Sequence, residues 1–460
     1  VTDELKRLMK EFEKELAILK GRVDGLEARV GELEATQFST TTKLSVQSSF
    51  TLGANFFGSN LDYSSKEVSQ IDTIFPDDGN SKSGSNLLLA SGDRGRVNLA
   101  ALDYVNYAQQ SYGALVFNYD TQIIFNTSFT GKDSLLTILR AGNYGSSSFG
   151  GGPTTLSTLE VASESDGGPN LGFIDKIFYN TPIGENLAFM IGANVGQDDM
   201  LPIWPSVYPL KDASTVLDVL TLNGAPAAYN LNQGPGVGLN WEQKGWNIGL
   251  QYISNLDRGS QSSSQKGGIA TDNSAATSTL QIGYQAEQWA IAGIYSYLQD
   301  AAIIPYATSF TQLSYLQDID QSVHAFALSG YWQPINSGFI PAVSLGWGIN
   351  TTSFNGDTTP DGYVSTSQSW QVSLLWFDAL MKGNTGGLAV GQATFATELT
   401  GGDSPDDQNY LWECWYSFQL TDNITLTPAV FYLSRPFGQL TPSNESFSQL
   451  GGLLRTTFTF

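Results

Sequence analysis

Hydrophobic and polar residues alternate with a period of two along most of the chain after residue 40. Such alternation gives a β-strand one apolar face and one face that accepts polar side chains. Residues 411–420 and 246–253 show the pattern clearly. We expect one set to face apolar surroundings (Trp412, Cys414, Tyr416, Phe418 and Leu420; Trp246, Ile248, Leu250 and Tyr252) and the other to face an interior (Leu411, Glu413, Trp415, Ser417 and Gln419; Asn247, Gly249 and Gln251).

The alternating segments come in pairs that are joined by short turns containing Gly, Asn or Asp, which are hairpin signals. Adding a first strand at 43–56 and a last strand at 451–460 to seven hairpins predicts sixteen strands, and eighteen remains the alternative. The seven predicted hairpins are 118–129 with 135–141, 173–179 with 187–195, 236–241 with 246–253, 279–284 with 289–297, 323–332 with 339–349, 370–380 with 388–397, and 411–420 with 424–433.

Long gaps separate the hairpins, so short and long connections alternate along the chain. This rhythm is typical of outer-membrane barrels, which have short periplasmic turns and long outer loops. No run approaches the roughly 18 apolar residues that a membrane-spanning helix needs. We therefore predict an all-β transmembrane barrel of about 16 antiparallel strands over residues 38–460, closed by pairing of 451–460 with 43–56. Taken alone, the last strand is also compatible with an ordinary sheet edge.

Residues 1–37 follow a different pattern, in which apolar positions are separated by four and three residues in turn. This spacing predicts an N-terminal α-helical coiled coil, which would lie in the periplasm. Glu15, Arg22 and Arg29 would pair with Lys20, Glu27 and Glu34 of a parallel partner. The alternative is a single amphipathic helix lying on the barrel, and the number of chains stays open. The predicted seam consists of Leu5, Met9, Phe12, Leu16, Leu19, Val23, Leu26, Val30 and Leu33.

Composition narrows the possible functions. A net charge of −22 with only 22 Lys and Arg argues against nucleic-acid binding. A single Cys414 excludes an intrachain disulfide, and a lone His324 beside Ser322 lacks a placed carboxylate, so we expect no enzyme activity and no cofactor. The acidic stretch 403–409 favours a solvated loop over a calcium site. Because the chain starts at Val1 within a helical pattern, we expect that N-terminal sequence has been removed.

A barrel of sixteen strands encloses water, so its function depends on what narrows the channel. The longest insertions, 58–111 and 197–235, are expected to fold inward. Opposed charges at a constriction would select small ions and polar solutes. The alternative is that these charges pair with each other on surface loops. The candidates for the constriction are Asp93, Arg94, Arg96, Asp198, Asp199, Lys211, Asp212, Glu413 and Arg455.

Four stretches, 19–30, 37–44, 126–133 and 140–143, resemble cyanobacterial outer-membrane porins, in which an S-layer-homology domain and a coiled coil precede a barrel similar to carbohydrate-selective porins. The resemblance implies a homotrimeric porin for small inorganic ions, often described as iron uptake. It also implies peptidoglycan binding through an N-terminal domain that lies outside this sequence. The alternative function is a structural anchor between the outer membrane and the cell wall.

Overall fold

The computed structural model describes residues 41–59, 101–165, 167–208, 215–299, 304–315, 320–336, 338–355, 361–441 and 446–460, and helical residues 2–7, 9, 12, 15, 19, 20 and 22. The side chains of 101–104 are not described. The described seam residues Leu5, Met9, Phe12 and Leu19 are helical and exposed, and the other five seam positions lie outside the described residues. The coiled coil therefore stays a prediction.

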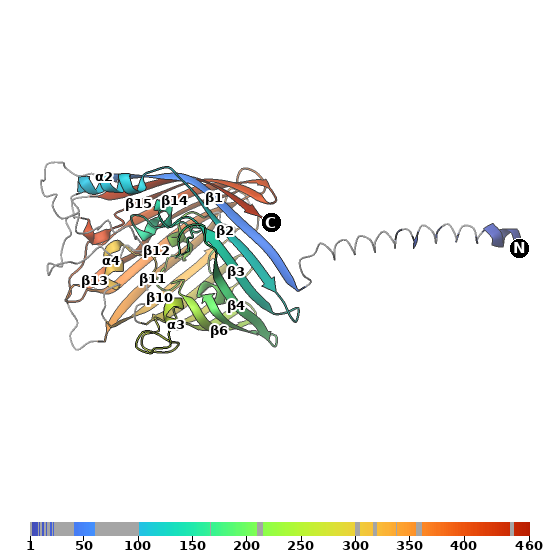
Figure 1. Cartoon of the computed structure of the whole chain (residues 1–460), viewed down its shortest axis with the longest axis horizontal. Helices are drawn as coiled ribbons and strands as arrows, with labels where there is room; N and C mark the ends of the chain where they lie inside the picture. Colours follow the sequence, from blue (N-terminus) through green and yellow to red (C-terminus); the bar gives the residue numbers. More distant parts are fainter. Residues whose placement is uncertain are drawn as a thin grey trace.

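The described residues after 40 form one closed barrel of sixteen antiparallel strands in which each strand pairs with its neighbours in sequence (Figure 1). The predicted barrel and its strand number are confirmed. The strands are β1 (Thr42–Ser59), β2 (Val116–Thr127), β3 (Ser134–Gly142), β4 (Phe173–Ile183), β5 (Leu187–Gly196), β6 (Gln233–Gln243), β7 (Trp246–Ile253), β8 (Thr277–Gln285), β9 (Trp289–Leu298), β10 (Gln321–Trp332), β11 (Ala342–Phe354), β12 (Val364–Phe377), β13 (Thr385–Leu399), β14 (Tyr410–Thr421), β15 (Ile424–Ser434) and β16 (Phe447–Thr459).

The first and last strands close the barrel as the sequence predicts. β1 and β16 are antiparallel over a long register that runs from Gln47 opposite Thr459 to Ser59 opposite Phe447. The ladder continues past β16, because Phe460 exchanges both backbone hydrogen bonds with Val46, at 2.6 and 3.0 Å. The last strand is thus not an open sheet edge.

The two faces of the strands are also as predicted. On β7, Trp246, Ile248 and Leu250 are exposed on the outside of the barrel, whereas Asn247 and Gln251 are buried inside it. β14 shows the same alternation, with Cys414 and Phe418 exposed, Tyr416 half-buried, and Glu413, Trp415 and Ser417 buried. The outward positions form the apolar belt that a membrane-spanning barrel needs.

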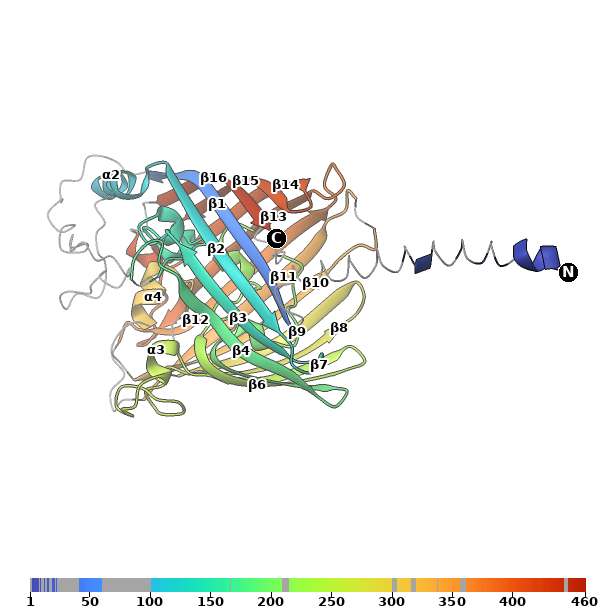
Figure 2. The same cartoon turned by 45° about the vertical axis from the view of Figure 1, so that its right-hand side comes forward.

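Short helices gather at the rim where the long connections lie (Figures 1 and 2). They are α2 (Ala101–Tyr112), α3 (Leu256–Gly259) and α4 (Ser309–Tyr315), and none of the helices in the described part of the chain is long and apolar enough to cross a membrane. Helix α2 lies against β1, where the Phe57 backbone N–H donates to Gln109. Residues 60–100 of the first long insertion are outside the described residues.

The main hydrophobic core lies inside the barrel, between the wall and segments that enter from the long-connection rim. The largest contribution comes from residues 197–232, called here the inserted segment and described except for 209–214. It contains the short helices η5 (Asp198–Met200) and η6 (Asp218–Thr221). A second contribution comes from residues 144–165, with η3 (Ser148–Gly150) and η4 (Thr155–Ser157). The prediction that 197–235 enters the barrel is confirmed for the described residues of 197–232, whereas 233–235 begin strand β6 of the wall.

Small inward residues make room for the inserted segment. An ideal Cβ on Gly346 would lie 1.6 Å from the Asn223 carbonyl oxygen, and one on Gly249 would lie 2.5 Å from Pro202. Only glycine allows such a close approach of chain to wall. We call the inward glycines that contact the inserted segment the docking face: Gly238, Gly249, Gly283, Gly346 and Gly348.

Candidate functional site

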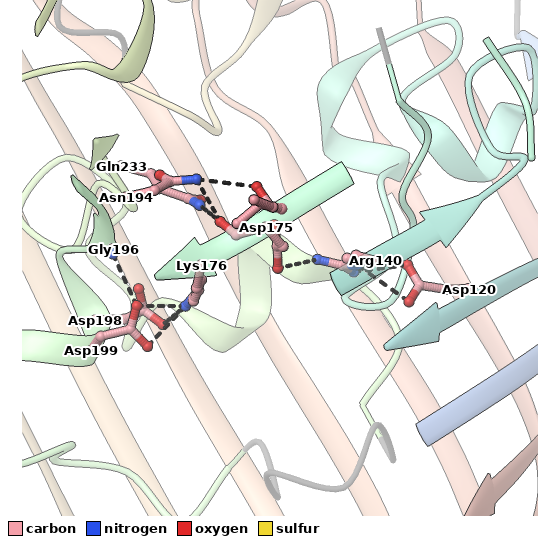
Figure 3. A network of polar contacts seen from close by, with 10 residues as sticks. Asp120, Arg140, Asp175, Lys176, Asn194, Gly196, Asp198, Asp199 and Gln233 are labelled. Carbon is pink, nitrogen blue, oxygen red and sulfur yellow. Dashed lines mark hydrogen bonds and ion pairs between the residues drawn. The ribbon is translucent and has the colours of Figure 1, made fainter. Parts of the chain in front are cut away.

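Charged side chains gather on the inner faces of the neighbouring strands β2, β3 and β4 (Figure 3). Arg140 donates from Nε to Asp120 at 2.9 Å, and its Nη2 lies 2.8 Å from the same carboxylate. Its Nη1 lies 3.7 Å from Asp175 on β4. The guanidinium group therefore bridges two carboxylates that belong to the strands on either side of it.

A β-bulge explains why two consecutive residues of β4 both face this site. The pairing of β3 with β4 shifts between Ile138 and Leu139, which leaves Asp175 without a register partner beside Lys176. A bulge re-aims side chains that regular alternation would send to opposite faces. Asn194 donates to the Asp175 carbonyl at 2.7 Å, and Gln233 donates to the same oxygen, so side-chain amides stabilise the irregular backbone.

Lys176 connects the wall to the beginning of the inserted segment. Its Nζ lies 3.3 Å from Asp198 and 2.7 Å from Asp199 on η5 (Figure 3). Asp199 also accepts a 2.9 Å hydrogen bond from the Gly196 backbone. Burial and the neighbouring Asp198 raise the pKa of Asp199 to about 6, although Lys176 opposes the shift. The sequence candidates Asp198 and Asp199 therefore lie inside the barrel, next to an arginine and a lysine that were not among the candidates.

Except for Asp120, which is 2% exposed, these residues keep contact with water. The side chains are 18% exposed at Arg140, 14% at Asp175, 17% at Lys176 and 36% at Asp198. We call Asp120, Arg140, Asp175, Lys176, Asp198 and Asp199 the charged face. It has four carboxylates and two cations, so it has a net negative charge, which is larger while Asp199 is ionised.

Two carboxyl groups of the entering segments lie near this face. Glu160 and Asp218 are adjacent because an antiparallel bridge joins Leu159 to Leu217, with Glu160 N–H donating to Val216 at 2.9 Å. Tyr306 donates to Asp218. Burial raises the pKa of both carboxyl groups, and for Glu160 the nearby Asp218 raises it further. We call Glu160 and Asp218 the acid pair.

Glu413 and Arg455 face inward, as predicted, but their side chains are 0% and 1% exposed. Glu413 accepts from Tyr208 and from the Leu217 backbone, the latter at 2.6 Å. Arg455 Nη1 donates to the Thr215 carbonyl oxygen at 2.6 Å. Both residues contact the inserted segment and do not contact the water beside the charged face. Five further candidates, Asp93, Arg94, Arg96, Lys211 and Asp212, lie outside the described residues.

The structure brings together residues that the sequence analysis did not single out. Arg140 carried a usable signal, because it is a cation at an inward position of a predicted strand in a chain with few arginines. Asp175 and Lys176 carried none, because alternation assigns neighbours to opposite faces and a bulge cannot be read from it.

The acidic stretch 403–409 and His324 were considered above for calcium binding and for catalysis, and both lie apart from the charged face. Asp407 is fully buried and accepts from Thr308, Thr311 and the Ala396 backbone. Within the described residues no group of three or more His, Cys, Asp or Glu has a metal-binding arrangement. His324 Nδ1 lies 2.8 Å from the Tyr295 hydroxyl and its ring packs against Tyr295 and Tyr297.

Comparisons with known proteins agree with the barrel. A family model described as "Carbohydrate-selective porin, OprB family" matches residues 2–460. Two uncharacterized cyanobacterial proteins are each 25% identical to this chain: one from Nostoc sp. matches 99% of the chain and 72% of its own length, and one from Synechocystis sp. matches 100% and 76%. The structure of Pseudomonas putida OprB is similar in fold, with a TM-score of 0.52, 10% identity and coverage of 94% of this chain and 96% of that one.

Proposed function

The chain belongs to the carbohydrate-selective porin family, OprB, and we propose that it is a homotrimeric outer-membrane porin through which small inorganic ions, iron among them, and small polar solutes diffuse passively. The carrying observation is the charged face, where Arg140, Asp175, Lys176 and Asp198 stay in contact with water inside a barrel whose other wall is covered by the inserted segment.

The pore runs along the charged face, and the inserted segment, which supplies Asp198 and Asp199 to that face, narrows it. Asp198 and Asp199 contribute charge to the constriction directly. Glu413 and Arg455 contribute by holding the segment, since neither is exposed. Excess carboxylate at a narrow point raises the local concentration of cations and lowers that of anions. The pore therefore prefers cations to anions.

Planar-bilayer recording of the purified protein tests the proposal. We expect ohmic current that appears in steps of three, because each inserted trimer carries three barrels. A salt gradient across the bilayer then measures the reversal potential, which should have the sign of cation preference. An intact, folded barrel that inserts into the bilayer and passes no current would rule out the diffusion function.

We also propose that residues 1–37 form a periplasmic coiled coil that joins the three chains. Its support is the four-three spacing together with the exposed apolar side chains of Leu5, Met9, Phe12 and Leu19. Removing 1–37 and measuring the mass of the complex in detergent tests the contribution of the helix. We expect the trimer to survive, because contacts between barrels should bury more surface than the helices do.

The packed interior favours one other function, in which the barrel is a structural anchor and a longer N-terminal region binds peptidoglycan. The same bilayer recording separates the two functions, because an anchor needs no conductance. A deletion strain with normal permeability but a detached outer membrane would favour the anchor.

A further inference from the structure

We propose that Glu413 is the positioning residue that fixes the inserted segment against the barrel wall and thereby sets the width of the pore. This inference rests on the proposed porin function and concerns the same channel. Glu413 lies on β14, which is not one of the strands of the charged face, and its carboxylate is completely buried.

The Glu413 carboxylate accepts hydrogen bonds from three groups of the inserted segment. Oε2 accepts from the Leu217 backbone at 2.6 Å, and Oε1 accepts from the Tyr208 hydroxyl and, at 3.4 Å, from the Val216 backbone. The donors come from both ends of the stretch 208–217, so a single carboxylate fixes both ends of this part of the chain. Charge-assisted hydrogen bonds are stronger than neutral ones, which suits a group that must hold a long segment in place.

The surrounding wall is shaped for this contact. Trp415 lies on β14 two residues after Glu413, and its Nε1 donates to the Tyr208 hydroxyl at 2.8 Å. The Tyr208 hydroxyl therefore donates to Glu413 and accepts from Trp415. The Trp415 ring fits because residue 387 is glycine: a Cβ there would lie 2.2 Å from the ring. Arg455 on β16 adds a second contact, to the carbonyl oxygen of Thr215.

The residue that bonds Glu413 is the direct neighbour in sequence of a residue that borders the pore. Leu217, which donates to Glu413, is followed by Asp218, which belongs to the acid pair beside the charged face. Asp218 N–H also bonds to the Thr158 carbonyl at 3.0 Å, so the second entering segment is held through the same backbone. A shift of residues 215–218 away from β14 therefore moves groups that border the water-filled side.

The Glu413 side chain has no part in the strand pairing. The ladder of β14 with β13 and β15 places Glu413 opposite Ala389 and Phe431 through backbone groups alone. The barrel is therefore expected to close when the carboxylate is replaced, and the effect should fall on the inserted segment.

The test uses the full chain carrying Glu413→Ala, with Glu413→Gln as a variant of the same shape and Ser417→Ala as the control. Ser417 lies on the same strand and the same inward face, and its hydroxyl contacts Thr427 on β15. Single-channel conductance in planar bilayers, the size limit for neutral sugars in liposome swelling, and hydrogen exchange of the backbone over 208–222 are measured for each protein.

We expect Glu413→Ala to raise the conductance about twofold, to admit larger sugars and to speed hydrogen exchange at Val216 and Leu217, while Ser417→Ala stays at the wild-type values. Glu413→Gln should lie between them, because its amide oxygen still accepts one backbone N–H. Glu413→Gln, which removes the charge and keeps the shape, should leave the reversal potential near the wild-type value, because Glu413 is not exposed to permeating ions. A shift in Glu413→Gln as large as the shift in Arg140→Gln would instead mean that Glu413 acts by its charge in the pore.

Wild-type conductance and size limit in a folded Glu413→Ala protein would overturn the inference and leave the porin function intact. If Glu413→Ala does not fold, Tyr208→Phe removes one of the hydrogen bonds and should give a smaller rise in conductance; no rise would also overturn it. If the wild-type protein conducts no ions, the porin function fails, and the exchange of Val216 and Leu217 still reports whether Glu413 holds the segment.

Discussion

Two parts of the inner wall, the docking face and the charged face, differ in what their inward side chains allow. On the docking face, glycines let the inserted segment come into direct contact with the wall, as at Gly346 and Asn223. On the charged face, long side chains such as Arg140 and Lys176 occupy that space and remain partly in water. The same strand geometry therefore builds a filled wall or a wet wall according to the size and charge of the inward residues.

The comparison also shows two ways of using a buried charge. Glu413 accepts its hydrogen bonds from uncharged donors of the inserted segment. Arg140 and Lys176 are each surrounded by two carboxylates. A buried charge is costly unless it is well bonded, so Glu413 and Lys176 depend on the inserted segment staying in position, whereas Arg140 is held by two strands of the wall.

The largest effect is expected from filling the docking face. Gly346→Val would place side-chain atoms on the Asn223 carbonyl oxygen, so the segment or the wall must move. We expect a loss of about 1–3 kcal/mol in unfolding free energy together with altered conductance. Urea unfolding and bilayer recording measure both. The control is Gly452→Val, because a Cβ at Gly452 meets no atom within 4 Å. Equal stability of the two variants would contradict the close contact.

The second largest effect is expected for Arg140→Gln on the charged face, and it concerns ion selectivity. Removing the guanidinium leaves Asp120 and Asp175 without their shared cation, so the local charge becomes more negative. We expect the ratio of cation to anion permeability to rise about twofold. The reversal potential in a salt gradient measures it, and Lys132→Gln, in an exposed turn at the other rim, is the matched loss of one positive charge. The same shift in both variants would mean that total charge matters and position does not.

A pH dependence should follow from Asp199. Its pKa is raised to about 6, so the carboxyl group gains a proton as the pH falls through 6 and the charged face loses one negative charge. We expect cation preference to fall between pH 7 and pH 5 and to recover on return to pH 7. In Asp199→Asn the cation preference should no longer change between pH 7 and pH 5, and it should stay at the value that the wild-type protein has at pH 5. An unchanged profile in the variant would assign the titration to another group, such as the acid pair.

The smallest effect is expected at Asp198. Its side chain is 36% exposed and its distance to Lys176 is 3.3 Å, so water screens its charge and Asp199 keeps the lysine bonded after substitution. Asp198→Asn should lower the cation permeability ratio by less than Arg140→Gln raises it. Reversal potentials of the two variants, measured in the same gradient, give the order, and a larger effect at Asp198 would place the narrowest point at η5.

Much of the wall could be predicted because alternation is a local property. Each apolar residue of β7 or β14 is placed outward by its neighbours in sequence, and the hairpin turns limit where strands begin and end. The site was predicted less well. Asp198 and Asp199 were identified from their place in a long insertion, whereas Arg140 and Lys176 gained their importance only from strands and loops that are distant in sequence.

The sequence by itself determined the barrel: sixteen strands, their two faces, and the pairing of β1 with β16. Only the tertiary structure decided which side of the lumen is filled. That choice depends on the bulge at Asp175, on the glycines that admit the inserted segment, and on the bonds of Glu413 to Tyr208 and Leu217. These features bring together residues far apart in the chain, and a repeating local pattern contains no information about such distant contacts.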